Sequence, residues 1–154
     1  MSKHIKLVYE SLNELYKFEK KSDPLSSLGV GKKALIEKWL DEMKLSNSSH
    51  INDDYTINYA GSVDLWNKKL DKLPDYIQFN KVYGKFNIGK NNLTSLKGCP
   101  LFVAGFFACN NNQLKNLDFF PECVEGGCDV SRNPVKFNYK YVKSISKIKG
   151  AIYT

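Results

Sequence analysis

The chain has 154 residues, a length that fits one domain and excludes a large multidomain protein. Hydrophobic residues make up 42% of it and charged residues 25%, which is the profile of a folded globular protein and not of a disordered one. The 23 basic residues outnumber the 16 acidic ones, and the resulting net charge of +7 raises the question of an acidic partner.

Nothing in the sequence predicts a membrane protein or a secreted one. No apolar run approaches the roughly 18 residues that a membrane-spanning helix needs, and the first residues do not lead into the apolar stretch of a signal peptide. We therefore expect a cytoplasmic protein, in which four cysteines are reduced thiols and not a disulfide framework. No CxxC pair is present, so neither a structural zinc site nor any other cofactor is predicted.

The first fifty residues predict two amphipathic helices. Residues 4–20 carry apolar side chains at helical spacing, with charges on the other faces; the apolar ones are Ile5, Val8, Leu12 and Leu15. The Asp23–Pro24 step ends this helix, because a residue before proline is pushed out of the helical region. A second helix is predicted for residues 32–45, after a Gly-Val-Gly breaker, with inward side chains Leu35, Ile36, Trp39, Leu40 and Met43. The polar residues 46–54 predict a loop.

Five glycine-centred segments follow and define an internal repeat. The glycines are spaced 23, 21, 21 and 24 residues apart and are Gly61, Gly84, Gly105, Gly126 and Gly150. Apolar residues recur two positions before each glycine and, in most segments, two and four positions after it. Alternation with period two predicts a strand that buries these positions. A glycine between them admits a close neighbouring backbone or a bend.

A second set of positions recurs in step with the glycines. Leu-x-x-Leu pairs begin at Leu70, Leu93 and Leu114, each followed by a proline, and predict a turn or short helical piece that redirects the chain. Asn91 and Asn112 stand two positions before a leucine pair, and Asn133 holds the matching place. Such asparagines are expected to form hydrogen bonds with backbone N–H and C=O groups at a corner of the coil. Repeats of roughly 20–29 residues with this pattern are typical of leucine-rich-repeat-like solenoids.

The end of the chain predicts a short helix. Asn133–Pro134 has the character of a helix start. After it, apolar residues recur at helical spacing, and these are Phe137, Tyr141, Ile145 and Ile148. Lysines recur on an adjacent face, and these are Lys136, Lys140, Lys143 and Lys147.

Together these elements predict an α+β fold. A two-helix N-terminal cap, residues 1–50, covers one end of a leucine-rich-repeat-like β-solenoid of about four coils, residues 51–154, and a short C-terminal helix closes the other end. The caps are expected because the end of a solenoid exposes apolar edges. We expect the two parts to form one compact folding unit.

The net charge is concentrated at the C-terminal end, where residues 129–154 carry six basic residues and one acidic residue. Basic side chains on one helix face, with an aromatic ring nearby, bind the phosphates of nucleic acid or an acidic protein patch. The alternative is a solvated face that keeps this end soluble. The candidate binding residues are Arg132, Lys136, Tyr139, Lys140, Lys143 and Lys147.

No motif predicts catalysis. The Gly29–Lys33 run lacks the first glycine and the Ser/Thr of a phosphate-binding loop. Cys109 and Cys128 occupy inward positions of the repeat, whereas Cys99 and Cys123 are expected in loops with no base beside them. The aspartates near the start of the repeat are explained as turn residues. We therefore expect a protein without enzymatic activity, catalytic residues or a bound metal.

Four segments carry a resemblance to a family. They are Ser22-Asp23-Pro24 through Leu28–Gly31, the helix Ala34–Leu40, Ile51–Ile57, and Leu93-Thr94-Ser95-Leu96-Lys97-Gly98-Cys99-Pro100. With them, nearly the whole chain resembles a group of small leucine-rich-repeat-like proteins encoded by tailed bacteriophages. The third coil departs from the pattern at Asp118-Phe119-Phe120-Pro121. Two adjacent aromatics are costly to leave in water, so Phe119 or Phe120 is expected in the core or in a contact patch.

The resemblance implies a viral accessory protein. We expect a non-enzymatic protein-binding module that inhibits or modulates a host protein, for example in an antiviral defence system, in the manner of an anti-CRISPR protein. Two alternatives stay open: a binder of RNA, DNA or a ribonucleoprotein through the basic C-terminal helix, and a structural component of the virion.

Overall fold

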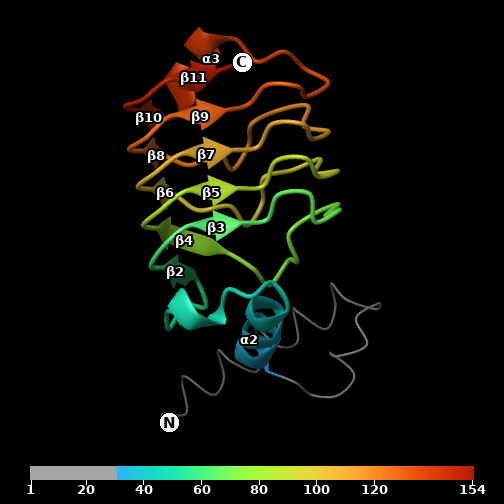
Figure 1. Cartoon of the computed structure of the whole chain (residues 1–154), viewed down its shortest axis with the longest axis vertical. Helices are drawn as coiled ribbons and strands as arrows, with labels where there is room; N and C mark the ends of the chain where they lie inside the picture. Colours follow the sequence, from blue (N-terminus) through green and yellow to red (C-terminus); the bar gives the residue numbers. More distant parts are fainter. Residues whose placement is uncertain (1–30) are drawn as a thin grey trace.

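In the computed structural model, which describes residues 31–154, short strands stack into a β-solenoid of about four turns (Figure 1). Within the described residues, one sheet has six strands in the order β1-β2-β4-β6-β8-β10, and the other has five in the order β11-β9-β7-β5-β3. We name these the first sheet and the second sheet. All neighbouring strands are parallel except β1 and β2, which are antiparallel.

Each coil gives one strand to each sheet. The first sheet consists of β1 (Ser49–Ile51), β2 (Ile57–Tyr59), β4 (Phe79–Val82), β6 (Phe102–Val103), β8 (Cys123–Val124) and β10 (Lys147–Ile148). The second sheet consists of β3 (Val63–Asp64), β5 (Phe86–Asn87), β7 (Phe107–Ala108), β9 (Cys128–Asp129) and β11 (Ile152–Tyr153). The α+β class and the solenoid predicted from the repeat are therefore confirmed.

The repeated glycines lie at the corner between the two sheets. The prediction of one strand running through each glycine is wrong in this respect, because the chain bends there and two short strands result. A Cβ atom on Gly105 would lie 2.8 Å from the carbonyl oxygen of Gly84, and one on Gly126 would lie 2.6 Å from that of Gly105. The corner backbones thus approach too closely for any side chain, and this explains why glycine recurs.

The core fills the space between the sheets, as the alternation predicts. The residues two positions before the glycines are buried, and they include Val82, Val103, Val124 and Ile148. The buried residues after the glycines include Phe86, Phe107, Ile88, Cys109, Cys128 and Val130. Four phenylalanine rings run through this core in contact, with centroids 5.2, 5.9 and 5.0 Å apart along the series Phe79, Phe86, Phe107 and Phe120.

The recurring asparagines form the polar ladder that the sequence predicts, in which Asn91 and Asn112 are buried and Asn133 is half-buried. The Asn112 side-chain oxygen accepts from the backbone N–H of Leu93 at 3.0 Å, while its Nδ2 donates to the carbonyls of Ile88 and Cys109. Asn91 and Asn133 bond in the same way one coil earlier and one coil later. Each asparagine therefore joins its own coil to the preceding one and satisfies backbone groups that the turn leaves unpaired.

At the N-terminal end of the solenoid lies α2 (Lys32–Glu42), which confirms most of the helix predicted for residues 32–45. It buries Leu35, Ile36, Trp39 and Leu40, and the Trp39 ring packs edge-on against Phe79 with centroids 6.3 Å apart. The predicted loop over residues 46–54 is partly wrong, since it contains the 3₁₀ turn η2 (Ser46–Ser48) and β1. The helix predicted for residues 4–20 lies outside the described residues.

At the other end lies α3 (Tyr139–Ile145), shorter than predicted. Its N-cap is Asn138, which accepts from the N–H of Tyr141, so the helix start predicted at Asn133–Pro134 is wrong. Asn133 is held in the asparagine ladder instead. The predicted apolar face is wrong as well: Val142 is the buried helical residue, while Phe137 precedes the helix and Ile148 belongs to β10. Within residues 31–154, no helix has the length and apolar character to cross a membrane.

Candidate binding surface

The structure divides the predicted basic residues among three places. Arg132 and Lys136 line a hollow of about 400 Å³ beside Val135, Phe137 and Thr154. Both basic side chains belong to exposed residues, as does Tyr139, which is 56% exposed. Of the predicted site residues, Arg132 and Lys136 are the two cationic residues that line the same hollow.

The other predicted lysines do not form one helical stripe. Only Lys140 and Lys143 belong to α3, and the Lys143 ammonium donates to the carbonyl of Ile148, a contact that ties the helix to β10. Lys147 belongs to β10, where it pairs with Cys123 of β8 on the first sheet. The predicted lysine face over residues 136–147 is therefore wrong, because the helix ends at residue 145 and the chain then enters a strand.

Lys147 belongs instead to a column of outward residues that crosses the first sheet. Strand pairing places Asn58 beside Lys81, Lys81 beside Phe102, and Phe102 beside Cys123, which is in turn beside Lys147. Their neighbours in the strands, such as Val82 and Val103, point inward and are buried. The outer face of the first sheet thus presents one residue from each coil, about 4.8 Å apart.

Two aromatic rings are in contact on this face, and we name them, with Leu101 next to Phe102 in the chain, the aromatic patch (Tyr83, Leu101 and Phe102). Tyr83 is 56% exposed and Leu101 is 48% exposed. The rings of Tyr83 and Phe102 lie in tilted contact with centroids 6.5 Å apart. The backbone N–H of Leu101 donates to the carbonyl of Asn80, which places it in the neighbouring coil beside β4. Phe102 itself is half-buried. Large apolar side chains that gather at a surface in this way mark interaction surfaces.

The repeat does not predict the aromatic patch, because the repeat is defined by inward positions that recur from coil to coil and the patch stands at positions that vary. Tyr83 stands one position before its glycine, where other coils have Ala60, Ala104 and Glu125. Phe102 stands three positions before its glycine, where neighbouring coils have lysine or cysteine. The outward positions do reveal Tyr83 and Phe102 when they are compared from coil to coil, since the other coils have polar or small residues at the same positions.

Side-chain amides border the patch toward the N-terminal end. The Asn80 amide donates to Asn58 at 3.1 Å, and the Asn58 amide donates to Asn52 at 3.2 Å. Asn52 in turn donates to the hydroxyl of Thr56. This chain of amides holds the outer side of β2 and β4 in a defined arrangement.

A thiol and an ion pair border the patch on the other side. The Cys123 thiol donates to the Glu125 carboxylate at 3.6 Å, and the same carboxylate pairs with the Lys149 ammonium one coil further on. The pairing with Lys149 lowers the pKa of Glu125. Desolvation, with the hydrogen bond and charge of Glu125, raises the pKa of the Cys123 thiol. This thiol is therefore protonated at neutral pH, contrary to what a nucleophile requires.

The remaining cysteines lie in the core. Cys109 and Cys128 are buried as predicted, and burial raises the pKa of Cys109 and raises that of Cys128 to about 12. Cys99 lies in a loop, as predicted, but it is 2% exposed, belongs to the core, and burial raises its pKa. Gly98, which precedes it, has a left-handed φ of 94°. Cys123 is thus the one cysteine whose thiol reaches the surface.

On the second sheet, two aromatic side chains lie over glycines of the next coil. A Cβ atom on Gly89 would come within 2.4 Å of the Trp66 ring, and one on Gly127 within 3.1 Å of the Phe106 ring. Phe106 also contacts Tyr153, with centroids 6.2 Å apart. Gly89 thus leaves room for the Trp66 ring, whereas at Gly127 the nearer atom is the carbonyl oxygen of Ala151, which a Cβ would approach to 2.3 Å.

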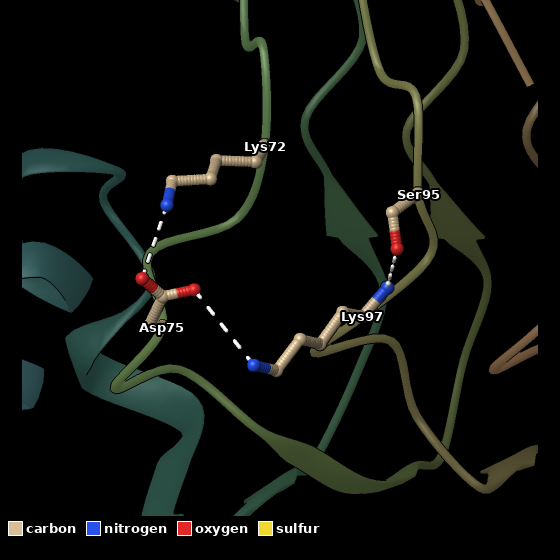
Figure 2. Close-up of polar contacts among 4 residues, drawn as sticks. All are labelled: Lys72, Asp75, Ser95 and Lys97. Carbon is tan, nitrogen blue, oxygen red and sulfur yellow. Dashed lines mark hydrogen bonds and ion pairs between the residues drawn. The ribbon is translucent and has the colours of Figure 1, made fainter. Parts of the chain in front are cut away.

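The turns opposite the corner carry an exposed phenylalanine and an ion cluster. Phe120 is buried against Phe107. Phe119 is 60% exposed and has a left-handed φ of 66°. It occupies the position that Gly98 has in the preceding coil. The Asp75 carboxylate lies 3.0 Å from the Lys72 ammonium and 3.9 Å from that of Lys97 (Figure 2).

The figure also shows the backbone N–H of Lys97 donating to the hydroxyl of Ser95. This cluster joins two successive coils across an exposed surface, where each ion pair contributes about 1 kcal/mol or less. Other predicted turn aspartates also accept local hydrogen bonds, as Asp54 does from Thr56 and Asp64 from the N–H of Trp66.

Among the described residues, no three histidine, cysteine or acidic side chains are grouped so as to hold a metal ion. The chain matches no protein-family model, and comparisons with curated proteins and with solved structures find no match either.

Proposed function

We propose that this protein is a non-enzymatic protein-binding module. The observation that carries the proposal is the aromatic patch, in which the rings of Tyr83 and Phe102 are in contact and Leu101, next to Phe102 in the chain, is exposed. Such residues are unfavourable in water and, once desolvated by a partner, contribute most of the energy of a protein interface. The short, stacked strands give this surface a rigid support, which lowers the entropic cost of binding.

The biological setting of the proposal comes from the resemblance. We propose a bacteriophage-encoded protein that acts in the host cytoplasm and inhibits or modulates a host protein, for example one of an antiviral defence. We propose further that the coils are leucine-rich-repeat-like and that residues 1–50 cap them. The asparagine ladder supports the first of these structural points, and the contact of Trp39 with Phe79 supports the second.

Affinity purification from host lysate tests the proposal, with the wild-type chain and Phe102→Ser compared side by side. A protein partner recovered by the wild type and reduced at least about ten-fold by the variant is the expected result. Phe119→Gly is the matched control, because it removes a phenylalanine ring that is 60% exposed on the turn side, at a place where the preceding coil has glycine. Recovery of no protein contradicts the proposal, and equal recovery by all three chains contradicts the aromatic patch as the binding surface.

A nucleic-acid or ribonucleoprotein binder is the second candidate, and the hollow between Arg132 and Lys136 favours it. Two cationic side chains beside an opening suit a phosphate group. The test is a salt titration of binding to an RNA and a DNA oligonucleotide. If this candidate is right, the double variant Lys136→Glu/Lys140→Glu abolishes binding and flattens the dependence on salt.

A further inference from the structure

The outer face of the first sheet combines an apolar centre with positive charge on both sides. Lys81 pairs with Phe102 in the neighbouring strand, and Lys147 follows two strands away on the other side, beyond Cys123. Both lysines are exposed, and neither has an ion-pair partner among the residues that the structure describes. Their charge is thus available to a ligand.

The acidic side chains near this face do not cancel that charge. Glu125 is already paired with Lys149, so these two side chains contribute no net charge to the surface. Toward β2 the border is made of neutral amides, Asn58 and Asn80. Glu122 is exposed but precedes β8, at the margin of the sheet. A complementary partner must therefore supply negative charge opposite Lys81 and Lys147 and an apolar side chain opposite Phe102.

On the basis of the proposed function, we propose that the outer face of the first sheet docks an acidic protein segment. The segment places an apolar side chain on the aromatic patch and carboxylates against Lys81 and Lys147. The two lysines are three strand steps apart, roughly 14 Å at about 4.8 Å for each step. An extended segment covers this distance in about four residues. The fitting segment therefore has acidic residues about four positions apart with a large apolar residue between them.

Cys123 provides a direct readout of this docking. Its thiol lies in the outward column between Phe102 and Lys147, and the chain's other three cysteines are buried. A segment that covers the column shields this thiol from alkylation, while one bound at the C-terminal hollow or on the second sheet leaves it accessible. The location of a ligand can thus be measured in the unmodified protein.

The test uses a displayed library of random twelve-residue peptides, selected for binding to the wild-type chain. The expected peptides contain an aromatic or aliphatic residue flanked by Asp or Glu, and their binding weakens as salt increases. They slow the alkylation of Cys123 by iodoacetamide at least about five-fold and bind Phe102→Ser at least about ten-fold more weakly. Lys81→Glu/Lys147→Glu also weakens binding at least about ten-fold, and Phe119→Gly does not change it.

Four results overturn the inference. The first is a selection that yields basic peptides or no peptides. The second is a set of binders that leave Cys123 alkylation unchanged and bind Phe102→Ser as tightly as wild type. The third is an RNA oligonucleotide that protects Cys123 while the peptides do not. The fourth is a partner protein, recovered from lysate, that binds Phe102→Ser as tightly as wild type but does not bind Phe119→Gly. This result refutes the first-sheet surface and leaves a protein-binding module whose binding surface lies elsewhere.

Discussion

Replacing Asn112 with alanine tests whether the asparagine ladder holds the coils together. Asn112 is buried, and its side chain bonds to Leu93, Ile88 and Cys109. The Ile88 carbonyl also accepts from Asn91, and the Cys109 carbonyl also accepts from Asn133. The N–H of Leu93 is therefore the group that the substitution leaves without its partner.

A buried donor left unpaired costs about 1–3 kcal/mol, and the lost hydrogen bonds add about 1 kcal/mol. We therefore expect Asn112→Ala to lower the free energy of unfolding by about 2–4 kcal/mol, which corresponds to a decrease in Tm of roughly 5–15 °C for a chain of this size. Urea unfolding followed by circular dichroism measures the change. Asn92→Ala, at an exposed asparagine of the preceding turn, is the control and stays within about 0.5 kcal/mol of wild type.

The contrary result is that Asn112→Ala unfolds at the same urea concentration as Asn92→Ala. That result would mean that the turn amide of Leu93 finds another partner, and that the ladder does not set the stability of the coils.

Three other substitutions give distinct outcomes. Gly105→Ala brings a methyl group against the backbone of the neighbouring corner, and we expect a loss of at least about 2 kcal/mol in urea unfolding. Gly89→Ala meets mainly the movable ring of Trp66, so it costs less than Gly105→Ala and shifts tryptophan fluorescence to longer wavelength as the ring moves into water. Glu125→Gln removes the negative charge that helps to raise the Cys123 pKa. We therefore expect a lower thiol pKa and several-fold faster alkylation at pH 8, measured by mass spectrometry.

The repeat made most of the solenoid predictable. The corner glycines and inward residues such as Phe86 recur in the sequence because each coil must satisfy the same packing and backbone constraints. The bend at each glycine was not predictable from alternation, since residues two positions before and after Gly105 are buried whether the chain runs straight or turns into a second sheet.

The C-terminal end was harder to predict because two roles compete for the same residue types. Asn133 has the sequence signal of a helix cap but continues the ladder, and Asn138 caps α3 instead. The lysines between residues 136 and 147 have helical spacing, yet strand pairing with β8 takes Lys147 into the first sheet. Pairing between coils therefore outweighs local helical periodicity at this end of the chain.

The central claim is that a protein docks on the aromatic patch of the first sheet. The most direct measurement is the dissociation constant of the recovered partner for wild type, Phe102→Ser and Phe119→Gly. We expect Phe102→Ser to bind at least about ten-fold more weakly, while Phe119→Gly stays within about two-fold of wild type. A partner that binds wild type and Phe102→Ser equally, or that is lost with Phe119→Gly alone, would contradict it.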